Sequence, residues 1–161
     1  MRLTTLCYPI RDGKVLLAMK KRGFGIGKLN GPGGKVQEGE TPEQACRREF
    51  LEETGSRAIE IEGRGTIEFA FPGKPEWDQL CHIFVATALE GEPQETEEMA
   101  PDWYPIDALP YDRMWEDDPY WLPGVLAGGK VNMRFEFDEE GGLIAWTDLS
   151  TKVPSRGRRE T

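Results

Sequence analysis

Three glutamates stand at a spacing that suits the binding of a divalent metal ion. Glu49, Glu52 and Glu53 occupy positions i, i+3 and i+4 of a segment with helical character. Because an α-helix turns about 100° per residue, their side chains share one arc of its surface. Like charges on one arc repel each other unless a positive charge compensates them. A solvated acidic face is the more common explanation for an arbitrary pair of glutamates, so the neighbouring residues decide between the two.

Those neighbours favour a metal site. Cys46 and Phe50 project beside the glutamates, so the acidic stripe borders the side of the helix that faces the core. Arg48 stands four residues before Glu52 and can hold that side chain, but one guanidinium is too little charge for three acids. Closely set oxygen ligands without histidine or thiolate suit Mg²⁺, or Mn²⁺ as a substitute, with water and substrate phosphate completing the coordination.

The glutamates belong to a longer pattern that resembles the Nudix hydrolase family. The motif of that family is G-x5-E-x7-R-E-U-x-E-E-x-G-U, where U is aliphatic. The matching residues are Gly34, Glu40, Arg48, Glu49, Phe50, Glu52, Glu53, Gly55 and Ser56. Seven fixed residues in register would arise by chance on the order of once in 10⁸ placements. The two departures, Phe50 and Ser56, concern packing more than chemistry.

The resemblance implies a role for each polar residue of the motif. The metal ligands would be the helix glutamates and a glycine carbonyl, namely Glu49, Glu52, Glu53 and Gly33 or Gly34. Arg48 would orient the glutamates, and either Glu49 or Glu53 would be the general base. Glu98 matches a position that supplies a further carboxylate in close relatives, and a solvated loop glutamate is an equally good interpretation of it. The glycine run would let a carbonyl approach an ion, because no Cβ hinders it.

Two segments outside the motif indicate the substrate. Residues 19–41 (MKKRGFGIGKLNGPGGKVQEGET) and 113–122 (RMWEDDPYWL) resemble the oxidised purine nucleoside triphosphatases of this family, and the likeness runs from about Leu3 to Leu149. The resemblance implies hydrogen bonds to the purine from Asn30, Asp117 and Asp118. The residues implied to line the pocket or to contact the nucleotide are Phe24, Phe69, Phe71, Trp115, Thr5 and Lys20.

Adjacent aspartates are physically suited to reading a purine. In an apolar pocket two neighbouring carboxyl groups do not both ionise, so one keeps its proton and donates while the other accepts. The alternative for Asp118 is a plain helix cap before Pro119, and for the aromatic residues it is core packing. Leu29 stands where close relatives carry an aromatic residue, so we expect a different pocket shape there. His82 is expected to be a strand residue rather than a base.

The expected activity is hydrolysis of an oxidised purine nucleoside triphosphate to the monophosphate and pyrophosphate. The substrates would be 8-oxo-dGTP and also 2-hydroxy-dATP, the cofactor Mg²⁺, and the role the cleaning of the nucleotide pool. Two alternatives stay open. One is a Nudix hydrolase of unmodified or methylated dNTPs or of a dinucleoside polyphosphate. The other is a nucleotide-sensing module without catalysis, which the complete set of catalytic residues disfavours.

These residues require a scaffold of strands and helices, and the sequence predicts an α+β fold. Short apolar or alternating runs predict strands at Leu3–Ile10, Lys14–Lys20, Thr66–Phe71, Leu80–Leu89, Val131–Phe137 and Leu143–Leu149. Asp12-Gly13 is typical of a hairpin turn. The family resemblance implies a mixed sheet sandwiched between helices.

Two helices are predicted. The first covers Pro42–Thr54, with Thr41 and Gln44 forming a capping box and Gly55 ending it. The second runs from Pro119 to about Ala127. Residues 21–33 and 90–101 are expected to be loops.

Length and composition indicate a single domain. The 161 residues suffice for one core, which we assign to residues 1–149, with a basic solvated tail at 150–161. No apolar run approaches the roughly 20 residues of a membrane helix, and no signal peptide is expected. The net charge of −9 disfavours a nucleic-acid polymer as partner. Three widely spaced cysteines favour a reducing cytoplasm, and we expect a monomer.

Overall fold

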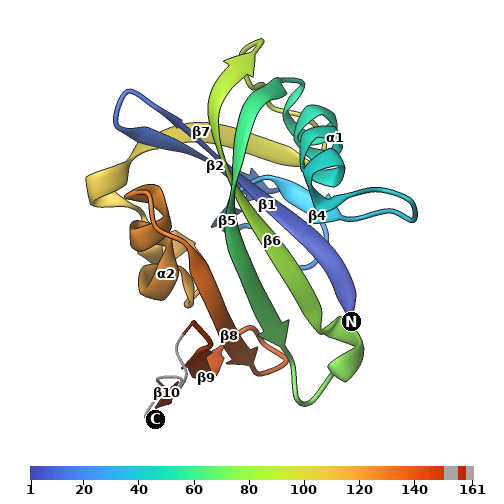
Figure 1. The fold of residues 1–161 in the computed structure, drawn as a ribbon, viewed down its shortest axis with the longest axis vertical. Helices are drawn as coiled ribbons and strands as arrows, with labels where there is room; N and C mark the ends of the chain where they lie inside the picture. Colours follow the sequence, from blue (N-terminus) through green and yellow to red (C-terminus); the bar gives the residue numbers. More distant parts are fainter. Residues whose placement is uncertain (151–155, 159–161) are drawn as a thin grey trace.

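One mixed β-sheet forms the centre of the molecule (Figure 1). The computed structural model describes residues 1–150 and 156–158. The strands in this part of the chain are β1 (Arg2–Arg11), β2 (Lys14–Lys20), β3 (Leu29–Asn30), β4 (Gly33–Lys35), β5 (Arg57–Ala70), β6 (Gln79–Glu90), β7 (Met99–Pro105), β8 (Val131–Phe137), β9 (Leu143–Asp148) and β10 (Arg156–Arg158). Their order is β10-β9-β8-β5-β6-β1-β2-β3, while β4 pairs with β1 and β7 pairs with β2. The pairs β1–β6 and β5–β8 are parallel.

Helices α1 (Pro42–Thr54) and α2 (Asp118–Leu126) lie on opposite sides of the strands in Figure 1. Neighbouring residues of β1 belong to two different cores: Cys7 joins the cluster that contains Phe50 of α1, and Tyr8 joins the cluster that contains Trp121 of α2. Successive strand residues point to opposite faces, so each central strand supplies both cores. The predicted α+β fold with helices on both faces of a mixed sheet is confirmed.

The local signals around α1 act as predicted. The Thr41 side chain accepts a hydrogen bond from the Gln44 backbone, and the Gln44 side chain accepts one from the Thr41 backbone. Gly55 ends the helix in the left-handed conformation with φ 74°. The core-facing side is as predicted too, because Cys46 and Phe50 are fully buried. The Asp12-Gly13 turn between β1 and β2 has positive φ at both residues, as a tight hairpin requires.

Strand β5 begins nine residues earlier than the predicted start at Thr66, since it spans Arg57–Ala70. Its pairing with β6 shifts register between Ala58 and Glu60, between Glu60 and Ile61, and between Gly63 and Thr66. Each shift interrupts the inside–outside alternation on which strand prediction depends. The prediction of Thr66–Phe71 alone was therefore too short.

Both predicted loops contain short strands. Residues 21–33 include β3 and the start of β4, and residues 90–101 include the start of β7. In β7, Pro101 and Pro105 weaken the strand signal, and prolines of this kind are tolerated on an edge strand. Helix α2 begins at Asp118, one residue before the predicted start, so Asp118 lies in the first turn and is not the cap.

The C-terminal residues depart from the expected solvated tail. Arg156–Arg158 form β10, which pairs antiparallel with β9 from Arg156 opposite Thr147 to Arg158 opposite Ala145. Of the other predicted tail residues, Ser150 is exposed, and 151–155 and 159–161 lie outside the described residues. A three-residue strand carries too little periodicity to be recognised.

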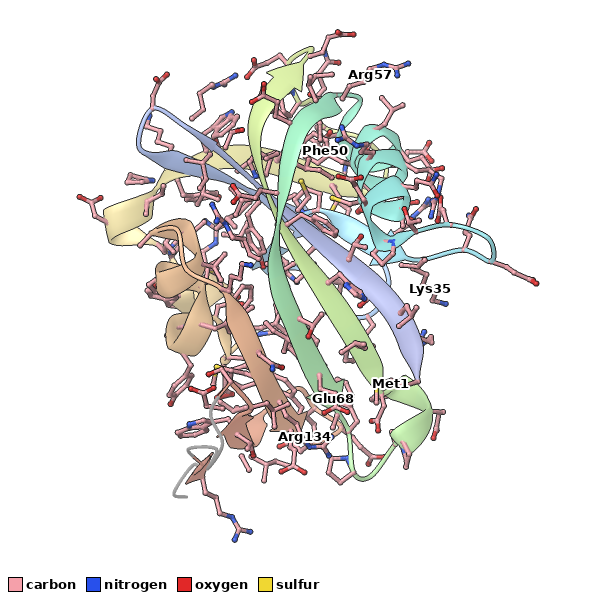
Figure 2. All side chains as sticks on the ribbon, viewed as in Figure 1. Met1, Lys35, Phe50, Arg57, Glu68 and Arg134 are labelled. Atoms are coloured by element: carbon pink, nitrogen blue, oxygen red, sulfur yellow. The ribbon has the colours of Figure 1, made fainter. Side chains whose placement is uncertain are left out.

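Side chains fill the space on both sides of the sheet (Figure 2). Phe50 lies between α1 and the strands, and at the far end of the sheet Glu68 of β5 forms an ion pair of 3.5 Å with Arg134 of β8. Cys7, Cys46 and Cys81 are buried free thiols. Among the described residues, neither helix combines the length and the apolar character needed to cross a bilayer.

Candidate active site

Glu53 is the most buried of the helix glutamates. Its side chain is on the core-facing edge of α1, the residue is 7% exposed, and its Oε1 accepts a hydrogen bond of 2.9 Å from the Gly33 backbone N–H. Burial and the charge of Glu49 raise the pKa of Glu53 to about 8, against the opposing effect of the Gly33 hydrogen bond. A buried carboxyl group in this state needs a cation nearby before it can stay ionised at neutral pH.

Arg48 connects the other carboxylates of the motif. Its Nη1 lies 2.9 Å from Glu49 Oε1 and 3.3 Å from Glu52 Oε2. On its other side, Nε donates to Glu40 Oε2 at 2.6 Å, and this pairing lowers the pKa of Glu40 to about 2. Burial raises the pKa of Glu49 despite the arginine. Arg48 is therefore held by Glu40 and orients two of the helix glutamates.

A side chain at position 33 would meet the backbone, and a side chain at position 34 would displace the carboxylate of Glu49. A Cβ on Gly33 would lie 1.8 Å from the Thr5 carbonyl oxygen, and a Cβ on Gly34 would lie 2.4 Å from the carboxyl carbon of Glu49. Neither residue has a positive φ, so close approach rather than backbone freedom accounts for both. Strand β4 can thereby lie directly against the glutamates of α1.

The glutamates and Gly33 line one cavity of about 350 Å³. Its lining residues are Lys20, Gly33, Glu49, Glu52, Glu53, Glu98 and Met99. Within the described part of the chain, no three acidic, histidine or cysteine side chains are yet gathered as a ligand set. Arg48 holds Glu49 and Glu52, and Arg22 pairs with Glu98. A metal ion would bind these carboxylates in place of the arginine side chains. The all-oxygen donor set fits a hard divalent cation.

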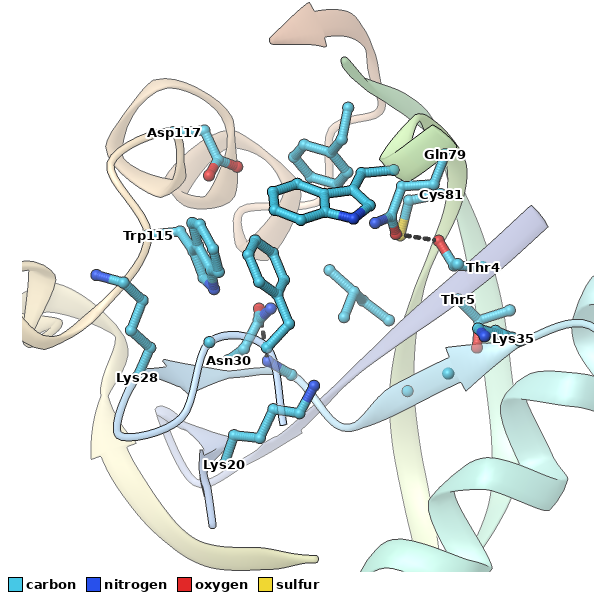
Figure 3. Close-up of a pocket in the computed structure, with 18 of the residues that line it drawn as sticks. Thr4, Thr5, Lys20, Lys28, Asn30, Lys35, Gln79, Cys81, Trp115 and Asp117 are labelled. Carbon is cyan, nitrogen blue, oxygen red and sulfur yellow. Dashed lines mark hydrogen bonds between the residues drawn. The ribbon is translucent and has the colours of Figure 1, made fainter. Parts of the chain in front are cut away.

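Figure 3 shows a second cavity, which has a volume of about 490 Å³. It adjoins the first, because Lys20 and Gly33 line both. Its walls are aromatic. Phe24 lies between Trp77 and Trp115, with ring centroids 5.2 and 5.4 Å away, and Phe71 packs edge-on against Trp77 at 5.6 Å. Phe69 also lines the cavity and stacks towards the buried Phe135. Rings at these distances form the flat apolar surfaces that a purine can stack against.

Asp117 and Asp118 lie in this cavity and are each 2% exposed. Trp121 Nε1 donates to Asp117 Oδ2 at 2.7 Å, whereas Asp118 Oδ2 is buried without a hydrogen-bond partner. Burial raises the pKa of Asp117 to about 6. Burial and the charge of Asp117 raise the pKa of Asp118 well above its usual range. The pair therefore offers one carboxyl group that can donate and one that can accept.

The remaining predicted contact residues lie around the same two cavities. Asn30 and Lys20 both line the larger one. Thr5 borders it as well, but the alternation of β1 places the Thr5 side chain with Cys7 on the α1 side of the sheet. Its hydroxyl is buried and has no hydrogen-bond partner.

Several lining residues were missed by sequence reasoning. Trp77, Gln79 and Lys28 all border the larger cavity. Trp77 lies in a single 3-10 turn, Pro75–Trp77, and Gln79 Oε1 accepts a hydrogen bond of 2.8 Å from Thr4. No local pattern marks these residues, because the segments that bring them together are far apart in the chain.

The positions at which the sequence departs from the family pattern have structural explanations. Leu29 is 1% exposed and belongs to the main core. It does not line the larger cavity, contrary to the expectation that the residue at this position shapes the pocket. Ser56 is fully buried, and its hydroxyl donates to the Gly91 carbonyl oxygen at 2.6 Å. His82 is in strand β6, as predicted.

Comparison with known proteins places this geometry in a family. A model described as NUDIX domain matches residues 1–125. The chain belongs to the Nudix family. An oxidized purine nucleoside triphosphate hydrolase of Danio rerio is 49% identical over 143 residues, which cover 89% of this chain and 91% of the relative. Its namesake in Mus musculus is 44% identical over 146 residues, covering 91% and 93%.

The fold comparison agrees with this assignment. The crystal structure of a mutator MutT protein from Bacillus halodurans superposes with a TM-score of 0.81 at 26% identity, covering 91% of this chain and 96% of the other. As a Nudix hydrolase, the protein is an enzyme of a family that generally needs a divalent metal ion. The cavity around the α1 glutamates has the oxygen ligands for such an ion.

Proposed function

We propose that this Nudix hydrolase cleaves oxidised purine nucleoside triphosphates, 8-oxo-dGTP foremost and 2-hydroxy-dATP in addition, to the monophosphate and pyrophosphate. The observation that carries the proposal is the buried Asp117–Asp118 pair in an aromatic cavity that adjoins the glutamate cavity. The names of the zebrafish and mouse relatives support the same substrate class.

The larger cavity would hold the base. Phe24 and Trp115 supply faces for stacking, and the aspartates and Asn30 supply hydrogen bonds along the purine edge. Asp118 Oδ2 has no partner in the protein, so a base that fails to satisfy it leaves a buried polar atom unpaired. Such a mismatch costs about 1–3 kcal/mol, enough to separate an oxidised base from a normal one.

The smaller cavity would hold the metal and the phosphates. We assign the ligand role to Glu49, Glu52, Glu53 and Glu98 with a carbonyl of Gly33 or Gly34, and the cation to Mg²⁺. When bound, Mg²⁺ would neutralise triphosphate charge and acidify the attacking water. Lys20, which borders both cavities, would contact the phosphates between base and metal.

Residues of the chain itself would orient the metal ligands and accept a proton from the attacking water. Arg48 keeps Glu49 and Glu52 oriented, and either Glu49 or Glu53 would accept the proton of water that attacks the β-phosphorus. The proposal includes a monomeric enzyme in the cytoplasm that cleans the nucleotide pool. The net charge of −9 favours small nucleotides over nucleic-acid polymers as partners.

The test is a substrate panel with Mg²⁺. We expect kcat/KM for 8-oxo-dGTP to exceed that for dGTP by at least about tenfold, with pyrophosphate as product. Equal values for the two would refute the oxidised-base specificity.

Two carboxylate substitutions test the metal site in the same assay. Glu52→Gln and Glu53→Gln should each lower kcat by at least about 100-fold, because each removes a ligand charge. Glu43→Gln on the same helix is the matched control, since Glu43 lies outside both cavities. Unchanged activity in both site variants would refute the metal assignment.

A further inference from the structure

The larger cavity contains an asparagine whose amide orientation is fixed by two hydrogen bonds within the protein. Two donors converge on Asn30 Oδ1: the Gly31 backbone N–H at 2.9 Å and the Tyr8 hydroxyl at 2.9 Å. A backbone N–H can only donate, so the atom that it contacts must be the amide oxygen. The Asn30 Nδ2 group is then the one left for a ligand. Figure 3 shows Asn30 inside the cavity, with a dashed line to the main chain.

Tyr8 reaches this position from the core. Its side chain is fully buried in β1, on the α2 side of the sheet, and it does not line the cavity. A Cβ on Gly31 would lie 2.9 Å from the Tyr8 ring, so the glycine is what allows the ring to lie under the Asn30–Gly31 peptide. Burial raises the pKa of Tyr8 well above its usual range, which keeps the hydroxyl protonated and able to donate.

The same ring also contacts the aspartate side of the cavity. Tyr8 packs edge-on against Trp121 with ring centroids 5.7 Å apart, and Trp121 Nε1 donates to Asp117 Oδ2. Tyr8 thus hydrogen-bonds to Asn30 and packs against Trp121, which hydrogen-bonds to Asp117. Simple core packing would need only an apolar ring here, so the hydroxyl requires a separate explanation.

We propose that Tyr8 is a positioning residue for base recognition, which together with the Gly31 backbone N–H holds the Asn30 amide so that it presents only N–H donors to the bound purine. The inference rests on the proposed function, because it takes Asn30 as a base contact. A donor-only amide selects a base edge with acceptors, such as a carbonyl oxygen, and disfavours an edge that presents an amino group at the same place. Tyr8 would therefore favour guanine-type over adenine-type substrates.

The experiment is a double-mutant cycle between Tyr8→Phe and Asn30→Ala. Tyr8→Phe removes the hydroxyl and keeps the ring. We expect it to raise KM for 8-oxo-dGTP about 3- to 10-fold, the effect of one hydrogen bond, with less than about twofold change in kcat. The Kd of 8-oxo-dGMP, measured by calorimetry without metal, should rise by the same factor. The preference for 8-oxo-dGTP over 2-hydroxy-dATP should fall.

In the Asn30→Ala background, Tyr8→Phe should change KM and Kd by less than about twofold. Tyr120→Phe is the matched control, since Tyr120 is half-exposed on α2 and outside the cavity. Equal effects of Tyr8→Phe in both backgrounds, or a loss in kcat alone, would overturn the inference. A wrong substrate assignment would give a different result. The wild type would then not prefer 8-oxo-dGTP over dGTP, but the double-mutant cycle would still show coupling between Tyr8 and Asn30 with the purine nucleotide that does bind.

Discussion

Asp118 carries a carboxyl group into a region where water cannot solvate its charge. Burial and the neighbouring Asp117 raise the pKa of Asp118. A group whose pKa is higher in the folded state contributes stability below its unfolded pKa, near 3.9 for aspartate, and that contribution is lost as the pH rises through the folded pKa. The wild-type protein therefore retains an ionisation cost at alkaline pH that an uncharged side chain would not have.

We predict that Asp118→Asn gains stability relative to the wild type as the pH rises. The difference in Tm between variant and wild type should be about 3 °C more favourable to the variant at pH 9 than at pH 6. Thermal unfolding at both pH values measures it. The exposed Asp112→Asn serves as control and should show no such trend. A pH-independent difference for Asp118→Asn would contradict the burial argument.

The loop between β2 and β3 depends on glycines in a conformation that other residues rarely adopt. Gly23, Gly25 and Gly27 have φ of 85°, 84° and 85°. A Cβ on Gly25 would in addition lie 3.0 Å from the Trp115 ring. The loop places Phe24 in the wall of the larger cavity, so its shape sets the distance between Phe24 and the two neighbouring tryptophans.

Gly25→Ala should therefore disturb substrate binding more than stability. We expect KM for 8-oxo-dGTP to rise at least about fivefold, with kcat changed less, because the substitution strains the backbone by about 1 kcal/mol or more and displaces Trp115. Gly27→Ala has the same positive φ and no neighbour near its Cβ, so it isolates the strain from the contact with Trp115. Steady-state kinetics of both variants provide the comparison. Equal KM values for the two would show that the Trp115 contact has no effect.

The cap of α1 gives a second prediction at the level of the element. The Thr41 hydroxyl oxygen accepts the Gln44 backbone N–H at 3.1 Å. Thr41→Ala should cost about 1 kcal/mol and lower Tm by about 3 °C. Thr41→Ser keeps the acceptor and should remain near the wild type. The measurement is thermal unfolding of both variants, and an equal loss in both would point away from the cap.

Elements with local signals were predicted well, and elements made by distant pairing were not. Helix α1 matches its predicted bounds because cap, proline and terminal glycine all lie within its own segment. Strands β4, β7 and β10 form only because β1, β2 and β9 offer an edge to pair with. Short segments of this kind, with glycine or proline, have little periodicity of their own.

The residues of the candidate site also fall into those predictable from local sequence and those brought together only by the fold. Glu49, Glu52 and Glu53 stand on one helix, so spacing alone predicts that they lie together. Trp77, from the turn before β6, lines the cavity only after the sheet has formed, and Tyr8 of β1 contacts the lining residue Asn30 for the same reason. A bulky side chain with a polar tip, in a strand that also contains Thr4 and Thr5, was the only sequence signal for Tyr8. For Trp77 there was none.

On the scale of the whole molecule, metal binding and folding are thermodynamically linked. The proposed ligands come from α1 and from the segments at Gly33 and Glu98, which lie together only in the folded chain. A ligand that binds only the folded state at 100 times its Kd stabilises it by about 2.7 kcal/mol. We therefore predict that saturating Mg²⁺ raises Tm by about 5 °C or more, and that EDTA reverses the rise.

The control for this prediction is the pair Glu52→Gln and Glu53→Gln. Either variant should lose most of the Mg²⁺-dependent rise in Tm, while Glu43→Gln should retain it. A rise of equal size in the site variants would place the bound ion elsewhere on this acidic protein.

The three thiols described above have a consequence for where such an enzyme can work. Peroxide attacks the thiolate form of cysteine, and both access and ionisation are needed. Cys7, Cys46 and Cys81 are at most 1% exposed, and burial raises the pKa of Cys81 to about 12. The chemical stress that damages purines therefore finds no accessible thiolate among the described residues, so cysteine oxidation is not a ready route to inactivation under the conditions that create oxidised purines.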